Sequence, residues 1–320
     1  MVWFSLVLLF LVILILLISY ITYRIAFYAS PRHRGEVLSL PQDANYSDSE
    51  RDSLQALMED MAQRPYETVS IRSCDGLTLY GRYYHFFDNA PLELQFHGYR
   101  GSALRDYCAG NRLAREAGHN ALVVDQRAHG KSEGRTITFG IKERLDCRCW
   151  VEYAANRFGK DTPIMLTGVS MGAATVLMAS ELELPGNIVG IVADSPFASP
   201  ESIISKVCAD LRIPPALAMP FLRLGARLFG HMDLSACSAL DAVARSKYPV
   251  LIIHGEKDDF VPCEMGRKLF DACASEKRLE LFPDAPHGFS FMVDPDRYRQ
   301  IIREFNEKYV DPHTKEADLS

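Results

Sequence analysis

The first pattern along the chain is a long apolar run. Residues 2–21 contain no charged side chain, and only Ser5, Ser19 and Tyr20 interrupt the apolar residues. A helix of about 20 residues is about 30 Å long, which matches the hydrocarbon core of a bilayer. A cleaved signal peptide would instead have a basic start, an apolar stretch of about 7–15 residues and a small-residue cleavage site. The run therefore favours an uncleaved transmembrane anchor over residues 1–23.

Basic residues follow this run, and none precedes it. Arg24, Arg32 and Arg34 lie just after the span. Because cytoplasmic flanks of membrane spans are enriched in Lys and Arg, we expect a single-pass membrane protein whose C-terminal body faces the cytoplasm. We further expect the anchor to act as a tether, so that removal of residues 1–30 leaves the chemistry of the body nearly intact.

A helical period appears next, in residues 47–63, SDSERDSLQALMEDMAQ. Apolar residues recur on one side of this segment, and they are Leu54, Leu57, Met58 and Met61. Ser47 and Glu50 have the spacing of a capping box, and Pro65 ends the pattern. We therefore predict a connector helix inside a juxtamembrane segment, residues 24–66.

From Glu67 the chain alternates between strand and helix patterns. Residues 67–86 alternate apolar and polar positions around Asp75-Gly76, which predicts a hairpin. Short apolar runs follow at 92–96, 121–125, 163–168, 188–194, 249–255 and 278–282, separated by helical stretches at 102–117, 141–158, 171–183, 263–275 and 295–309. Such alternation predicts an α/β domain over residues 67–310, with a mostly parallel sheet covered by helices on both faces.

One interval, between Asp194 and Pro249, carries no strand pattern. We expect a small helical cap there, at about residues 197–247, because long insertions of this kind are usually functional. Residues 211–232, LRIPPALAMPFLRLGARLFGHM, mix large apolar residues with Arg. Two interpretations stay open: the apolar face packs on the body, or part of it lines an acyl pocket or touches lipid. Residues 311–320 form a polar tail.

Charge and cysteine content exclude some classes of function. The chain has 35 basic and 41 acidic residues, a net charge of −6, and no basic stripe, which argues against nucleic acid as a partner. Several of the eight Cys residues fall inside predicted helices, where free thiols behave as small buried apolar side chains. Cys147 and Cys149 have no second pair at zinc-site spacing. We therefore expect no metal and no cofactor.

A serine marks the candidate chemistry. Ser170 lies in the sequence GVSMG, after an apolar strand pattern and before a helix pattern. This is the context of a nucleophile elbow, in which small residues such as Gly168 and Gly172 permit a sharp turn. A serine hydroxyl is a weak nucleophile, so it requires a base and an acid that orients the base.

The acid and the base that Ser170 requires are expected at the ends of later strands. In this architecture the chain order is serine, acid, histidine. Asp258 and Asp259 follow one strand pattern, and His287 follows the next. Oxyanion donors are expected from the N–H of the residue after the nucleophile, Met171, and from the N–H of Tyr99 in the loop HGYRGS.

These motifs together resemble the α/β-hydrolases, in the branch called prolyl-oligopeptidase-like or serine-aminopeptidase-like. The resemblance covers residues 67–310 and rests on FHGYRGS, VVDQRAHGKSEG, TGVSMGAA, IVADSPF, IHGEKDDFVP and PHGF. It implies Ser170 as nucleophile, His287 as base, and Tyr99 and Met171 as oxyanion donors. In the family pattern G-x-x-D-x-x-V-P the acid stands three residues after the Gly, which implies Asp258. The loop 125–134 matches a family signature, for which we expect a structural role facing the cap.

The expected activity follows from this set of residues. We predict a carboxylesterase or lipase-like serine hydrolase that acts on small-molecule or lipid esters through an acyl-enzyme intermediate. A serine peptidase is the main alternative, although the cap region carries no clear acidic cluster for a peptide amino terminus. A non-catalytic scaffold on the same fold is a third interpretation.

Overall fold

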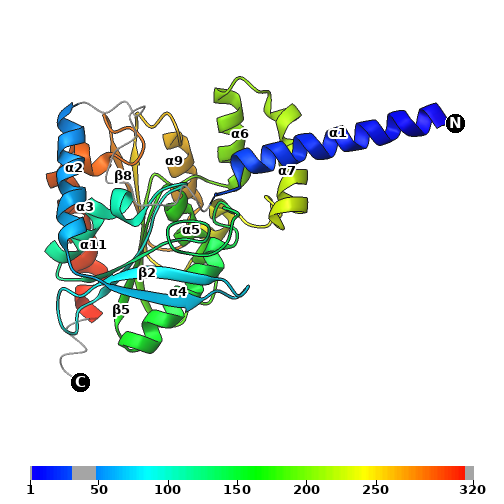
Figure 1. Ribbon diagram of the computed structural model, residues 1–320. Helices are drawn as coiled ribbons and strands as arrows, with labels where there is room; N and C mark the ends of the chain where they lie inside the picture. The colour runs from blue at the N-terminus through cyan, green and yellow to red at the C-terminus, as the bar shows by residue number, and fades with distance from the viewer. Residues whose placement is uncertain (1, 31–47, 314–320) are drawn as a thin grey trace.

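The computed structural model describes residues 2–30 and 48–313, in which eight strands form one sheet in the order β1-β2-β4-β3-β5-β6-β7-β8 (Figure 1). The strands are β1 (Glu67–Arg72), β2 (Thr78–Tyr84), β3 (Leu92–Phe96), β4 (Asn120–Val124), β5 (Pro163–Val169), β6 (Asn187–Asp194), β7 (Val250–Gly255) and β8 (Lys277–Phe282). β1 and β2 form an antiparallel hairpin, and β2 pairs antiparallel with β4. All other neighbours are parallel, so their carboxyl ends meet at one edge of the sheet.

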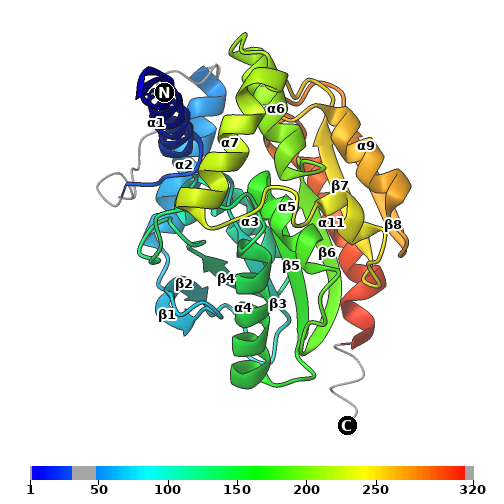
Figure 2. The same ribbon diagram turned by 90° about the vertical axis from the view of Figure 1, so that its right-hand side faces the viewer.

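Helices cover both faces of this sheet (Figure 2). On one face lie α2 (Asp48–Gln63), α3 (Ala103–Glu116) and α11 (Pro295–Tyr309). On the other face lie α4 (Glu143–Phe158), α5 (Met171–Ala179) and α9 (Cys263–Ala272). The short helix α10 (Ser290–Val293) precedes α11. Because both faces are buried, β3, β4 and β7 are buried along their whole length.

This architecture confirms the predicted sheet and its helices. Each predicted apolar run overlaps one observed strand, and the segment after Glu67 forms the predicted hairpin. Two helices end earlier than predicted. α5 stops at Ala179, where the chain turns and the N–H of Leu182 donates to the carbonyl of Ala179 at 2.9 Å. α9 stops at Ala272, so Cys273 lies just outside the helix in extended backbone.

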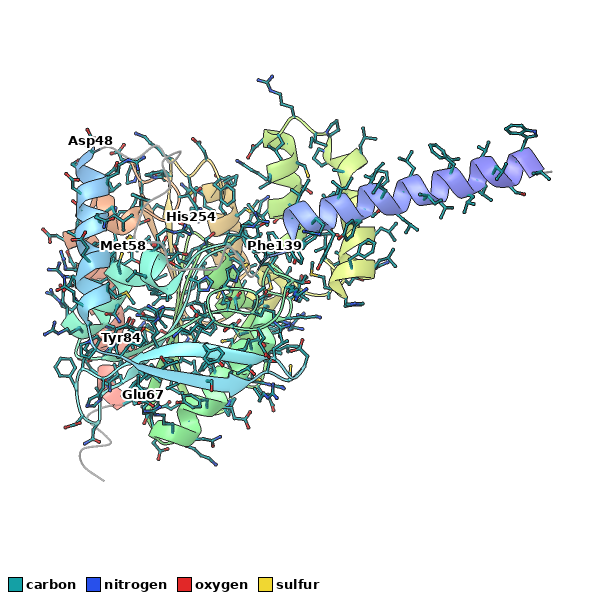
Figure 3. The ribbon with its side chains drawn as sticks, viewed as in Figure 1. Asp48, Met58, Glu67, Tyr84, Phe139 and His254 are labelled. Carbon is teal, nitrogen blue, oxygen red and sulfur yellow. The ribbon has the colours of Figure 1, made fainter. Side chains whose placement is uncertain are left out.

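The connector helix is also present, as α2. Its predicted apolar stripe is buried against α3 and against the sheet, and comprises Leu54, Leu57, Met58 and Met61. Figure 3 shows Met58 on α2 and Tyr84 at the end of the sheet that α2 covers. Ser47, the predicted cap of this helix, lies outside the described residues.

The interval between β6 and β7 contains three helices, α6 (Pro200–Asp210), α7 (Pro215–Gly230) and α8 (Ala239–Val243). α6 begins at a capping box, in which the Ser199 hydroxyl accepts a hydrogen bond from the Ser202 N–H at 3.1 Å. Pro215 begins α7, a position where its missing N–H costs nothing. α6 and α7 form a helical hairpin beside the base of the N-terminal helix (Figure 2).

The N-terminal helix α1 (Val2–Ala26) projects away from the body, and it is long and apolar enough to span a bilayer, with a mean hydropathy of 3.1 (Figure 1). Residues 2–17 are all exposed, whereas Ser19 and Tyr23 are buried. A Cβ at Gly225 of α7 would overlap the carbonyl oxygen of Ser19, so glycine is required where the two helices cross.

The end of α1 and the residues just after it pack on the body. The N–H of Ile137 donates to the carbonyl of Phe27 at 2.8 Å, and the N–H of Ala29 donates to the carbonyl of Arg135 at 2.9 Å. The Tyr23 hydroxyl lies 2.8 Å from the Thr136 hydroxyl, and Phe27 is fully buried. Residues from Ser19 onward therefore bury side chains and pair their backbone with the body, which argues against the expectation that residues 1–30 act only as a tether.

Candidate active site

The nucleophile candidate lies on a strained turn between β5 and α5. Ser170 has φ 55° and ψ −115°, a backbone conformation that residues other than glycine rarely adopt. A Cβ at Gly172 would overlap the carbonyl of Phe96, and a Cβ at Gly168 would overlap the backbone of Gly172. The two glycines thus allow the turn to pack tightly, and the Ser170 N–H is held by the carbonyl of Asp194 at 2.8 Å.

Three residues singled out in the sequence meet at this turn. The Ser170 Oγ lies 2.9 Å from Nε2 of His287, and Nδ1 of His287 lies 2.7 Å from Oδ2 of Asp258. The His287 side chain keeps 25% of its surface exposed, while Asp258 and Ser170 are buried. Asp259 is exposed, and its backbone carbonyl accepts a hydrogen bond from Lys206. The contacts of His287 therefore single out Asp258 from the two neighbouring acids.

Asp258 is held in its ionised form. Its Oδ1 accepts the N–H groups of Phe260 at 3.0 Å and Val261 at 2.7 Å. Burial alone would raise its pKa, but hydrogen bonds from His254 and His287 outweigh this effect and lower the pKa to about 2. A carboxylate that stays charged at neutral pH can fix the imidazole with Nδ1–H toward Asp258 and Nε2 toward Ser170.

A second histidine reaches the same carboxylate. Nε2 of the fully buried His254 lies 2.9 Å from the carbonyl of Val261 and 3.3 Å from Oδ2 of Asp258. Because a carbonyl only accepts, Nε2 of His254 carries the proton. A Cβ at Gly266 would lie 2.6 Å from the ring, so α9 packs tightly on it. The position of His254 at the end of β7 gives no sign in the sequence of this contact with Asp258.

The loop after β3 lies against the nucleophile. A Cβ at Gly98 would lie 3.4 Å from the Cβ of Ser170. The Gly98 N–H donates to Oδ2 of Asp106 at 2.8 Å, and the Arg100 N–H donates to Nε2 of His129 at 3.0 Å. These bonds fix the backbone on both sides of the intervening residue, which is Tyr99. Met171, the other predicted oxyanion donor, follows the nucleophile directly as the first residue of α5.

The side chains of this loop contact the end of α1. The Tyr99 hydroxyl donates to the carbonyl of Ala26 at 2.8 Å, and the Arg100 guanidinium donates to the carbonyl of Ile25 at 2.8 Å. The ring of Phe139 lies between, with ring centres 5.1 Å from Tyr99 and 5.7 Å from Phe27. Figure 3 labels Phe139 at the base of α1. The last turn of the N-terminal helix therefore supports the loop beside Ser170.

The signature loop 125–134 has a structural role. Arg127 is buried and forms a bidentate pair with Asp146 of α4, with both N···O distances at 2.7 Å. It also contacts Asp75 in the hairpin at 2.8 Å and 3.1 Å. Arg127 thus joins the hairpin to α4, and not to the cap as expected. His129 of the same loop supports Arg100, as described above.

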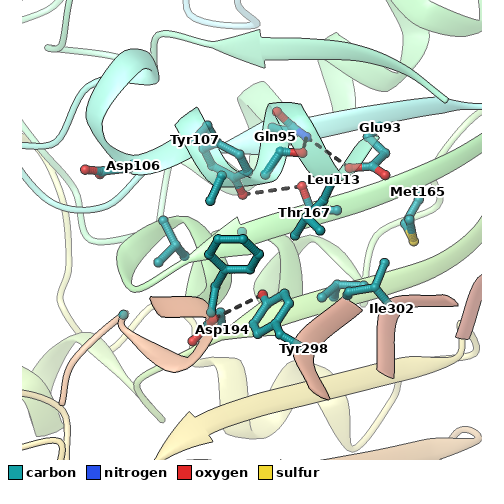
Figure 4. Close-up of a pocket in the computed structure, with 17 residues that line it drawn as sticks. Glu93, Gln95, Asp106, Tyr107, Leu113, Met165, Thr167, Asp194, Tyr298 and Ile302 are labelled. Atoms are coloured by element: carbon teal, nitrogen blue, oxygen red, sulfur yellow. Dashed lines mark hydrogen bonds between the residues drawn. The ribbon is translucent and has the colours of Figure 1, made fainter. Parts of the chain in front are cut away.

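A small cavity of about 100 Å³ lies behind the turn (Figure 4). Among its lining residues, the Tyr298 hydroxyl donates to Oδ2 of Asp194 at 3.1 Å, and burial raises the pKa of Asp194. The Ser195 hydroxyl donates to Oδ1 of Asp194 at 2.9 Å and lies 3.2 Å from the N–H of Gly288. The pair Asp194–Ser195 thus links the nucleophile turn to the loop of His287, a role that the sequence did not indicate.

Comparisons with known proteins bear on the family and the fold of the chain. A family model described as serine aminopeptidase, S33, matches residues 94–235. The uncharacterized protein YqkD of Bacillus subtilis is 28% identical over 197 residues, which cover 61% of this chain and 65% of that protein. The uncharacterized membrane protein YNL320W of Saccharomyces cerevisiae is 27% identical, over 60% of this chain and 62% of that protein. The matches thus span just under two thirds of these two relatives.

A solved structure shares the fold over most of the chain. The esterase Pf2001 of Pyrococcus furiosus superposes with a TM-score of 0.61 and 25% sequence identity. The superposition covers 85% of this chain and 99% of the esterase. The sheet and its covering helices thus belong to an architecture already known from an esterase structure.

Proposed function

Because the chain belongs to the α/β-hydrolase superfamily, we propose that it is a membrane-anchored serine hydrolase that cleaves acyl esters through an acyl-enzyme intermediate. The observation that carries this proposal is the chain of hydrogen bonds from Ser170 through His287 to Asp258, at 2.9 Å and 2.7 Å. A nucleophile, a base and an orienting acid at these distances form the arrangement that acyl transfer requires.

Acylation is the first step of the proposed reaction. The Ser170 Oγ attacks the ester carbonyl carbon while Nε2 of His287 takes the hydroxyl proton. The carbonyl oxygen becomes an oxyanion that accepts hydrogen bonds from the backbone N–H groups of Tyr99 and Met171. When the tetrahedral intermediate collapses, the carbon–oxygen bond of the ester breaks and His287 gives its proton to the leaving alcohol. The acyl group stays on Ser170.

Deacylation reverses these roles. His287 removes a proton from water as the water oxygen attacks the acyl carbon, and the same two N–H groups hold the new oxyanion. The bond to Ser170 then breaks, Ser170 regains a proton from His287, and the carboxylic acid leaves. Asp258 stabilises the imidazolium in both steps because its low pKa keeps it ionised.

The membrane assignment rests on α1. Its residues 2–17 expose apolar side chains of the kind that a bilayer would cover. A relative that is called a membrane protein supports it. We assign residues 1–23 as the anchor and about 197–247 as the cap, and we place the body on the cytoplasmic side because Arg24 follows the span.

Ester substrates are favoured over peptides by the likeness to an esterase structure. The serine peptidase remains the second candidate because the matching family model carries the description serine aminopeptidase. A scaffold without activity is disfavoured by the intact hydrogen-bonded set around Ser170.

A fluorophosphonate probe and a panel of substrates test the proposal. We expect the probe to label the native chain and not Ser170→Ala, and we expect Ser170→Ala to lose on the order of 10⁴–10⁶ in kcat on an aryl ester. Circular dichroism should show that the variant is folded. Wild-type turnover by Ser170→Ala would refute the assignment of the nucleophile, and faster cleavage of aminoacyl amides than of matched esters would favour the peptidase.

A further inference from the structure

Helix α7 presents an apolar stripe that the body does not cover. Its inner side is buried and comprises Met219, Leu222 and Ala226. On its outer side, Leu217, Pro220, Leu224 and Leu228 recur at helical spacing. Leu217 is 67% exposed and Leu228 is 45% exposed, Pro220 is also exposed, and Leu224 is half-buried. We call these four residues the α7 stripe.

The α7 stripe borders the N-terminal helix. At 100° per residue, Gly225 and Phe229 lie on one side of the stripe, and Arg223 and Arg227 lie on the other. Gly225 is the crossing point with α1, and the ring of Phe229 packs on Tyr20 at 5.1 Å. The exposed apolar surface of α1 therefore continues directly onto the stripe.

The two helices meet at the level where the exposed part of α1 ends. Residues 2–17 are exposed, and the first buried residue of α1 is Ser19, whose carbonyl lies against Gly225 of α7. In Figure 1 α7 runs across α1 instead of along it, and Figure 2, viewed nearly along α1, shows the two helices side by side. A helix that crosses a membrane span at the end of its exposed part lies in the plane of the bilayer surface. Tyr20 and Arg24, at the same level of α1, are residue types enriched at that surface.

We propose that α7 lies flat in the membrane interface, with the α7 stripe inserted among the lipid acyl chains just below the headgroups. This inference rests on the proposed anchoring of α1 and adds the bilayer surface as a partner of the cap. Amphipathic helices bind this region through their apolar face.

Apolar insertion, and not charge, drives the proposed contact. Arg223 pairs with Glu201 at 2.7 Å and 3.0 Å, and Arg227 pairs with Asp233 at 2.6 Å. Because both guanidinium groups have carboxylate partners within the protein, they add little attraction for anionic headgroups. The contact should therefore form equally on zwitterionic and on anionic lipid.

Tryptophan quenching in vesicles tests this placement. The full-length chain is reconstituted in phosphatidylcholine vesicles whose acyl chains carry bromine near the headgroups. Leu217→Trp and Leu228→Trp are each introduced in a Trp3→Phe background, with Phe87→Trp as the matched control, since Phe87 is 43% exposed on the body. Trp150 is fully buried and gives a constant background. We expect bromine to quench the new tryptophan of both α7 variants, and to leave the control unchanged.

Quenching of native Trp3 by the same bromine near the headgroups tests the anchoring of α1 separately, because residue 3 lies at the far end of a span of about 20 residues, close to the headgroups of the other leaflet. If Trp3 is quenched but the α7 variants behave like the Phe87→Trp control, α7 lies off the membrane and this inference is wrong while the anchor stands. If Trp3 is not quenched, the proposed anchoring fails and this inference fails with it. Quenching of the α7 variants that requires phosphatidylglycerol would overturn apolar insertion as the driving force.

Discussion

Truncation of the N-terminal segment at two points distinguishes an anchor from a part of the catalytic body. Among the described residues, removal of residues 1–17 deletes only exposed side chains, those of residues 2–17. Removal of residues 1–30 also deletes Tyr23 and Phe27, together with the carbonyl that accepts the Tyr99 hydroxyl. The longer truncation therefore removes a short additional segment that makes many contacts with the body.

The size of the difference follows from those contacts. Tyr23 and Phe27 are 6% and 0% exposed, and burial of each side chain contributes about 1.5–3 kcal/mol. The hydrogen bonds to Thr136, Tyr99 and the backbone of Ile137 add about 1 kcal/mol each. The total is on the order of 5–10 kcal/mol, which is comparable with the whole net stability of a domain, about 5–15 kcal/mol.

We therefore expect the shorter truncation to fold and to hydrolyse a water-soluble aryl ester with the full-length kcat. The longer truncation should unfold at a much lower urea concentration and lose most of that activity. Both chains and the full-length protein are measured in the same detergent by urea unfolding and by steady-state kinetics. Phe27→Ala in the full-length chain is the matched control, with an expected loss of about 3–5 kcal/mol. Equal urea midpoints and equal kcat for the two truncations would refute the reasoning.

The remaining predictions concern the acid and the loop beside the nucleophile. In an ester assay, Asp258→Asn should lower kcat by about 10⁴-fold because His287 then takes the wrong tautomer, whereas Asp259→Asn should stay near the wild-type rate. If Asp259→Asn is the inactive variant instead, the acid is Asp259. The pKa of Asp258 is lowered from 3.8 to about 2, so its ionisation adds stability that is full above pH 4 and is lost as the pH falls through about 2. The difference in the free energy of unfolding between wild type and Asp258→Asn should therefore narrow over that pH range. Tyr99→Phe removes the hydrogen bond to the carbonyl of Ala26, worth about 0.5–1.5 kcal/mol. This variant should lower kcat by less than about tenfold and leave KM unchanged. An unchanged kcat would show that the bond does not position the loop.

The elbow, the strands and the candidate acid and base could be predicted because each signal is local in sequence. Gly168, Ser170 and Gly172 occupy one turn, and steric exclusion of a Cβ decides their identity. Strand and helix periods place Asp258 and His287 at strand ends, and parallel pairing then brings those ends to one edge of the sheet.

The support of the site by α1 could not be predicted in this way. Tyr99 and Ala26 lie 73 residues apart. The N-terminal run is apolar at nearly every position, so no pattern marks where exposure to the surroundings ends and packing on the body begins. The contact of His254 with Asp258 depends on the direction of a ring, which residue spacing does not specify. The role of Ser195 depends likewise on a hydrogen bond to a backbone N–H 93 residues away.

The glycine crossing of α1 and α7 has a mechanical consequence. Without a side chain at Gly225, the two helices touch backbone to backbone, and the bonds of Tyr23, Tyr99 and Arg100 act on the same end of α1. With α1 across a bilayer, the helix and the body then move together as one rigid unit. A span that tilts to match a thinner membrane would rotate the sheet and Ser170 by the same angle, so bilayer thickness would set the orientation of the catalytic turn.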